Sequence, residues 1–213
     1  MNPNDVVGYL KSHPSFFEDN AELLSGITVP HPLTGQAIPL VERQVINLRQ
    51  KNRILESKLN ELIQFGEEND TLAERVHRLA IGLILARDLD AALAVLYASL
   101  RDDFGVPHVA ARLWRGSADG PEFSDVSAAL REYAAGLAHP FCGPNASFES
   151  AGWFTVGSEH VRSVAFMALR DQKETFGLLA LGSEDAKRFY PEMGTLYLGR
   201  IGDLASAALT RHL

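Results

Sequence analysis

The stretch that decides the fold is residues 161–182, VRSVAFMALRDQKETFGLLALG. It holds two runs, Val161 to Leu169 and Thr175 to Gly182, in which nearly every residue is apolar. Short apolar runs bounded by polar turns are typical of strands with both faces buried. Arg170 to Glu174 is short enough to join the two runs as a hairpin loop. The C-terminal part of the chain is therefore predicted to form around an antiparallel pair of strands.

Helices and one further strand surround this hairpin. Asp88 is a suitable N-cap for the first helix, and proline and glycine mark the loops. The predicted elements, in order, are a helix from Leu89 to about Asp103, a strand from His108 to Arg115, a helix beginning at Ser124 or Asp125, a loop from His139 to Gly152, the hairpin, and a terminal helix after Pro191. This order predicts an α+β domain over residues 86–213.

Residues 39–85 have the spacing of one long helix. Apolar residues recur alternately four and three positions apart, and no proline occurs from Val41 to Val106. A stripe held over about six heptads predicts a coiled-coil helix that joins two copies of the chain into a homodimer. The residues predicted at the dimer interface are Val41, Val45, Leu48, Asn52, Leu55, Leu59 and Leu62.

Polar residues of this helix indicate the register and the orientation in which two copies would pair. An asparagine at a stripe position, Asn52, fixes the register at a cost in stability. Lys51 and Glu56 flank the stripe at a spacing that favours parallel pairing, although antiparallel pairing stays open. The first half of the helix is rich in Arg and Lys. A solvated helix face explains that charge more simply than an anionic partner does.

Residues 1–38 are predicted to form a small helical N-terminal unit. Asn2 and Pro3 are suited to open a short helix. The unit is too short to bury a core of its own, so we expect it to dock on another part of the protein or on a partner.

The tail of the chain carries the clearest family motifs. They are Ser163-Val164-Ala165, Phe176 to Ser183, Asp185, Arg188-Phe189, Pro191, Met193-Gly194-Thr195 and Leu198. Val29-Pro30-His31, Gly35, Leu40 to Gln44 and Cys142-Gly143-Pro144 belong to the same pattern. Together these segments resemble the uncharacterised bacterial family called domain of unknown function 484, in which a GAF-like domain follows a helical N-terminal segment. The resemblance spans nearly the whole chain and supplies no catalytic residue.

This resemblance implies a particular arrangement of sheet, helices and ligand. GAF domains hold small ligands between a six-stranded antiparallel sheet and the loops and helices that cover one of its faces. Terminal helices lie on the other face and often pair between subunits. In this chain, the segments before Arg87 and after Pro191 would be those helices.

Strand 108–115 indicates which residues face a ligand. Val109, Ala111 and Leu113 share one face, which should pack on the long helices, while Arg112 and Trp114 share the other. An arginine beside an aromatic ring suits an anionic or planar ligand. The residues predicted to bind the ligand are Arg112, Trp114, Phe141, Cys142, Trp153 and Phe166. In the alternative interpretation, the arginine reaches solvent and the aromatic rings belong to the core.

Catalytic, metal and cofactor motifs are weak in this sequence. Cys142 is the only cysteine, which excludes an internal disulfide, a multi-cysteine metal site and a redox cycle that needs a second thiol. His139 lies three residues before it, so a Cys–His nucleophile pair is conceivable. A half-buried loop cysteine is the simpler interpretation. The seven histidines lack metal-ligand spacing, and no glycine-rich phosphate motif occurs, so we predict neither metal nor cofactor.

Charge and hydropathy complete the functional prediction. The chain has 20 Lys and Arg against 27 Asp and Glu, a net charge of −7, which argues against a general nucleic-acid binder. No apolar run reaches the length that a bilayer requires, and no signal-peptide pattern is present, so we expect a cytoplasmic protein. The sequence favours a non-enzymatic regulatory or sensor module that is dimeric and binds a small molecule. The alternative is a protein-interaction adaptor whose GAF-like pocket is vestigial and closed.

Overall fold

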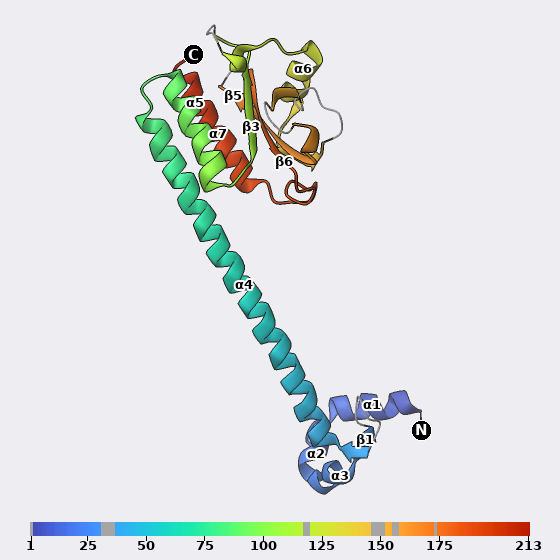
Figure 1. Ribbon diagram of the computed structural model, residues 1–213. Coiled ribbons are helices and arrows are strands. Elements are labelled where there is room, and N and C mark those ends of the chain that lie inside the picture. Colours follow the sequence, from blue (N-terminus) through green and yellow to red (C-terminus); the bar gives the residue numbers. More distant parts are fainter. Residues whose placement is uncertain (1, 31–36, 117–119, 146–151, 155–157, 173) are drawn as a thin grey trace. The chain divides into compact units, whose positions relative to one another are not determined.

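The computed structural model (Figure 1) describes residues 2–30, 37–116, 120–145, 152–154, 158–172 and 174–213. The chain divides into two compact units, residues 1–67 and residues 68–213. One long helix, α4 (Leu40–Leu85), contributes residues to both units and closely follows the predicted range. None of the helices in the described residues is long and apolar enough to cross a membrane.

The first unit consists of short elements and the first part of α4. These elements are α1 (Pro3–Ser12), α2 (Phe16–Asp19), α3 (Ala21–Gly26), β1 (Thr28–Pro30) and β2 (Ala37–Pro39). Asn2 caps α1 as predicted, since its side chain accepts a hydrogen bond from the Asn4 backbone N–H. The two strands pair antiparallel. No described residue between 2 and 67 is buried, so this unit has no core of its own in the described residues.

The second unit contains an antiparallel sheet. Its strands are β3 (His108–Leu113), β4 (Phe141–Pro144), β5 (Ser163–Arg170) and β6 (Thr175–Ser183), in the order β3-β6-β5-β4. The predicted hairpin is confirmed as β5 and β6. Within the described residues the sheet has four strands, against the six that the family resemblance implied.

One element of this sheet corrects the sequence analysis. Residues 139–152 were expected to form a loop, but Phe141 to Pro144 form β4 and pair with β5, Phe141 opposite Phe166 and Cys142 opposite Ala165. Proline and glycine in this segment gave a loop signal, whereas the apolar Phe141 and Cys142 decide the structure by packing on opposite sides of the sheet.

Helices cover both faces of the sheet. These helices are α5 (Leu89–Ala98), which continues into η1 (Ser99–Asp103), the short turns η2 (Pro121–Phe123) and η4 (Ser158–His160), α6 (Ala128–Gly136), and α7 (Leu196–Thr210). Figure 1 shows α5 and α7 side by side against one face, with α6 on the other side. The end of α4 joins the first group through Val76, Leu79 and Leu83, which are buried in the same core as α5 and α7.

Gly177 marks how closely β3 and β6 approach each other. A Cβ atom at this position would lie 2.7 Å from the Arg112 carbonyl oxygen and 2.8 Å from a Leu113 methyl carbon. Both distances are well inside van der Waals contact, so the strand pairing requires glycine here.

Candidate functional site

Strand β3 separates its side chains between the two cores of the second unit, as its alternation predicts. Ala111 and Leu113 are buried with α4, α5 and α7, and Val109 packs against the same helix-side core. Ala110 and Trp114 belong to the core on the α6 side. The prediction that the apolar face of this strand packs on the long helices is confirmed.

Arg112 lies on the α6 side of the sheet. Its guanidinium group contacts the Trp153 ring and a backbone carbonyl oxygen there. The guanidinium carbon lies 4.8 Å from the centroid of the Trp153 ring, within cation–π range. Its Nη1 donates a hydrogen bond to the Ala111 carbonyl oxygen at 2.9 Å. Burial lowers the pKa of Arg112, while the nearby Tyr97 and Glu122 oppose that shift. The group remains a cation, because an arginine pKa starts far above neutral pH.

Tyr97 and Glu122 form a polar cluster at the outer edge of β3. The Tyr97 hydroxyl donates to the Glu122 carboxylate at 2.8 Å and accepts from the Ala111 backbone N–H at 3.2 Å. Burial first, and then the Glu122 charge, raise the pKa of Tyr97 well above its ordinary value. The tyrosine therefore stays protonated and satisfies a backbone donor on an edge strand.

The aromatic residues predicted to bind the ligand pack tightly instead of lining an open space. Phe141 stacks on Phe166 with ring centroids 5.7 Å apart. The Trp114 Nε1–H donates to the Thr175 carbonyl oxygen at 2.9 Å, which ties the end of β3 to the start of β6. Trp153 is buried beneath Arg112. These contacts are those of a filled core face.

Cys142 lies apart from the other five predicted ligand residues. It points into the helix-side core, opposite to its neighbour Phe141, because successive strand residues face opposite sides. Burial raises the pKa of the Cys142 thiol to about 11, so the thiolate is scarce at neutral pH. His139 is exposed.

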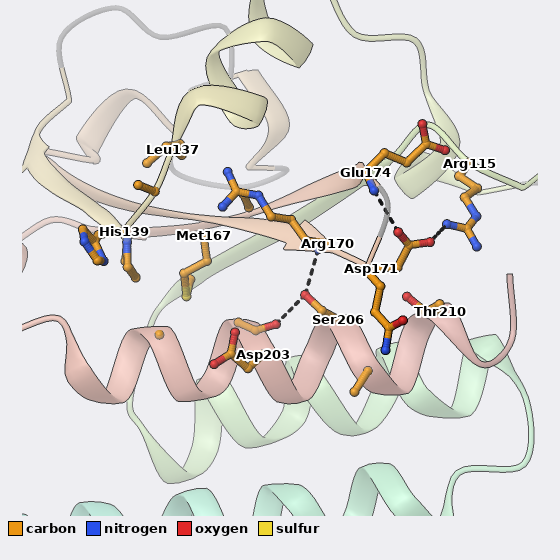
Figure 2. Close-up of a pocket in the computed structure, with 17 residues that line it drawn as sticks. Arg115, Leu137, His139, Met167, Arg170, Asp171, Glu174, Asp203, Ser206 and Thr210 are labelled. Atoms are coloured by element: carbon orange, nitrogen blue, oxygen red, sulfur yellow. Dashed lines mark hydrogen bonds and ion pairs between the residues drawn. The ribbon is translucent and has the colours of Figure 1, made fainter.

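Two cavities are described in the second unit, and none of the six predicted ligand residues lines either of them. The smaller, about 610 Å³, lies beside α6. The larger, about 1040 Å³, lies between the end of β5, one face of α7 and residues 137–140; we call it the β5–α7 cavity (Figure 2). The spacing of residues does not predict this cavity, because it forms where a short strand meets small residues from a helix distant in the sequence.

The predicted dimer residues lie on α4 in the first unit, where their side chains are exposed. We call Val41, Val45, Leu48, Leu55, Leu59 and Leu62 the exposed stripe; the six range from 39% to 66% exposed. Asn52 lies among them and is also exposed. The same spacing continues to Val76 and Leu83, which are buried within the second unit. Among the described residues, positions with this spacing are therefore buried only beyond the exposed stripe, at Val76 and Leu83.

Together, a four-stranded antiparallel sheet between helices and a long N-terminal helix define a mixed α+β protein. The chain belongs to the family described as "Protein of unknown function, DUF484", whose model matches residues 1–213. The sequence prediction of this family is thereby confirmed.

Two curated proteins are similar to this chain in sequence. The chain is 28% identical over 216 residues to "Uncharacterized protein YigA" of Salmonella typhimurium, covering 97% of this chain and 90% of that protein. It is 34% identical over 97 residues to the protein of the same name in Escherichia coli, covering 46% of this chain and 41% of that protein.

Two solved structures are similar in fold. A free methionine-R-sulfoxide reductase from Neisseria meningitidis, solved with its substrate, is 18% identical with a TM-score of 0.50, covering 65% of this chain and 88% of that chain. A GAF domain of nlh2 from A. aeolicus, in an inactive state, is 12% identical with a TM-score of 0.49, covering 68% of this chain and 99% of that chain. At this level of identity the likeness concerns the fold and not the activity.

Proposed function

We propose that this chain is a non-enzymatic regulatory module that works as a homodimer and carries a small-molecule site on its GAF-like body. The observation that carries the proposal is the exposed stripe. Six large apolar side chains, which together with Asn52 are spaced alternately four and three positions apart, are each at least 39% exposed. Surface helices seldom leave such a stripe in water, and a second copy of the same helix would cover it.

A route for regulation follows from the position of α4 in the sequence. This one helix supplies the exposed stripe and also three core residues of the second unit, Val76, Leu79 and Leu83. A ligand that binds two arrangements of that core with different affinity would bias how the helices pair.

The ligand face that we propose is the α6 side of the sheet, with Arg112, Trp114, Phe141, Trp153 and Phe166. A planar or anionic ligand would replace the Trp153 ring over Arg112, whose guanidinium already makes a stacking contact there. Cys142 faces the opposite core, and we leave it out of this site.

A protein-interaction adaptor with a closed ligand face is the second candidate. It is favoured by the stacking of Phe141 on Phe166 and by the burial of Trp153. Thermal unfolding of the full chain with a panel of nucleotides and metabolites distinguishes the two candidates. A ligand at ten times its dissociation constant stabilises the folded state by about 1.4 kcal/mol. A stabilisation that disappears in Arg112→Ala supports the sensor, and the absence of any shift across the panel supports the adaptor.

An enzyme that uses Cys142 is disfavoured by the site itself. The thiol is buried and its pKa is raised to about 11. A nucleophilic cysteine needs the opposite environment, in which the thiolate is stabilised and accessible.

The dimer is tested with two charge-introducing variants of the same helix. Leu59 belongs to the exposed stripe and is 57% exposed, whereas Ile54 is 50% exposed but lies off the stripe. Sedimentation of Leu59→Glu at micromolar concentration should show monomer, because a carboxylate at a stripe position is buried on pairing. Ile54→Glu should remain dimeric. Equal behaviour of the two variants would refute pairing through the stripe.

A further inference from the structure

The β5–α7 cavity exists because a short strand stops beside a helix face of small residues. β4 begins at Phe141, directly after Pro140, and pairs with β5 only as far as Phe166. Proline lacks the N–H that a longer ladder would need. The α7 residues that line the cavity include Gly199, Gly202, Ser206 and Ala207. These residues have small side chains or none, which leaves the space beside the helix open.

Arg170 holds the walls of this cavity in place. Its backbone N–H donates to Ser206 Oγ at 3.0 Å, and Ser206 Oγ donates to the Gly202 carbonyl oxygen at 2.7 Å. Its guanidinium Nη2 donates to the carbonyl oxygens of Ala134 and Ala135, at 2.9 and 3.0 Å. Strand, helix α7 and the end of α6 are therefore tied together without a ligand, as in most preformed sites.

The two arginines that line the cavity have partners of different kinds. Arg115 forms an ion pair with Asp171, whereas the guanidinium of Arg170 donates only to neutral oxygens and points towards the end of α6. Asp203 projects from α7 beside Met167 (Figure 2), and its carboxylate has no hydrogen-bond or ion-pair partner among the described residues. The Thr210 hydroxyl oxygen is buried and also lacks a hydrogen-bond partner within the described chain.

Apolar surface lies next to these acceptors. Met167, Leu137, Pro140 and Ala207 line the same cavity. Its volume, about 1040 Å³, is that of a site for a small organic molecule. A carboxylate next to such a surface selects a ligand that carries a positive charge on an aliphatic body.

We propose that the β5–α7 cavity binds a small aliphatic amine, with its ammonium group on Asp203 and its hydrocarbon chain over Met167. This site is distinct from the α6-side ligand face and does not depend on dimerisation. Binding there would contact both α7 and the end of β5, two elements of the second unit.

The probe is n-hexylamine, titrated calorimetrically into the full chain at about 0.15 M salt, where long-range attraction to the net charge is screened. We expect saturable binding, and no comparable binding of the neutral isostere n-hexanol. Asp203→Asn should lower the affinity for hexylamine by about tenfold or more, because one charge-assisted hydrogen bond is lost. Glu192→Gln removes the same charge from an exposed residue that does not line the cavity, and it should bind like the wild type.

A second variant tests the location without changing charge. Ala207 is exposed and lines the cavity. Ala207→Leu therefore fills cavity space without disturbing the core, and it should also lower the affinity for hexylamine. The proposal is overturned if hexylamine does not bind, if hexanol binds equally well, or if Asp203→Asn and Glu192→Gln lower the affinity to the same extent. Because the dimer variant Leu59→Glu leaves this cavity intact, amine binding and self-association can fail separately.

Discussion

The two units use the same helix spacing in opposite ways. In residues 1–67, the residues of the exposed stripe on α4 lie open to solvent, and no described residue is buried. In residues 68–213, positions of the same series enter a core of more than twenty buried side chains. One pattern therefore supports an intramolecular core in one region and an unpartnered surface in the other. A heptad repeat predicts that a helix face will be covered, but it does not say by which chain.

Two leucines of α4 give the largest expected contrast. Leu79 is 1% exposed in the core of the second unit, whereas Leu62 is 66% exposed on the stripe. Leu79→Ala should lower the free energy of unfolding by about 2–5 kcal/mol at any protein concentration, because it leaves a cavity. Leu62→Ala should matter only where the protein is dimeric, so its effect on Tm should vanish on dilution. Denaturant unfolding at two protein concentrations checks this. If both variants lost stability by an amount independent of protein concentration, the contrast between the two leucines would be wrong.

The packing of the second unit is tested at Gly177. A Cβ there would meet the Arg112 carbonyl oxygen at 2.7 Å. Gly177→Ala should therefore destabilise the protein by about 1–3 kcal/mol, as overpacking does in a dense core. Chemical denaturation gives the value. An unchanged midpoint would mean that β3 and β6 separate easily, contrary to the tight core argued for this unit.

The buried thiol of Cys142 adds a pH dependence to the same unit. Its folded-state pKa is raised from 9.0 to about 11, so the folded protein favours the protonated form. This contribution to the free energy of unfolding is complete below pH 9 and is lost as the pH rises towards about 11, with a size of roughly 3 kcal/mol at most. Cys142→Ala should flatten the stability profile in that window. An identical slope in variant and wild type would show that this thiol titrates as if exposed.

The smallest effect is expected in the first unit, at Gly66. A Cβ at this helical position would meet no atom within 4 Å. Gly66→Ala should stabilise α4 by about 0.5–1 kcal/mol, because alanine loses less backbone entropy in a helix than glycine. Thermal unfolding should show a slightly higher Tm. A lower Tm at a concentration where the protein is monomeric would contradict this expectation, because a Cβ at Gly66 meets no atom of the described chain.

Much of the fold could be predicted from local pattern. The β5–β6 hairpin, the extent of α4 and the two faces of β3 follow from period and polarity, which are properties of neighbouring residues. β4 was missed because its proline and glycine resemble a loop, while the pairing that makes it a strand comes from β5, more than twenty residues later.

The candidate sites depended on contacts that no local pattern records. The Tyr97 hydroxyl donates to the carboxylate of Glu122, which is 25 residues away. Ser206 accepts from Arg170, 36 residues earlier, and so shapes a wall of the β5–α7 cavity. Side chains that meet only after the sheet and helices pack cannot be located from spacing alone.

The most direct test of the central claim is the molar mass of the full chain by light scattering across a dilution series. One chain has a mass of 23.3 kDa. Pairing through the exposed stripe predicts twice 23.3 kDa, about 46.6 kDa, at micromolar concentration and a fall towards 23.3 kDa on dilution. A mass of 23.3 kDa at every concentration would contradict the account, because the stripe would then stay in water in the functional protein.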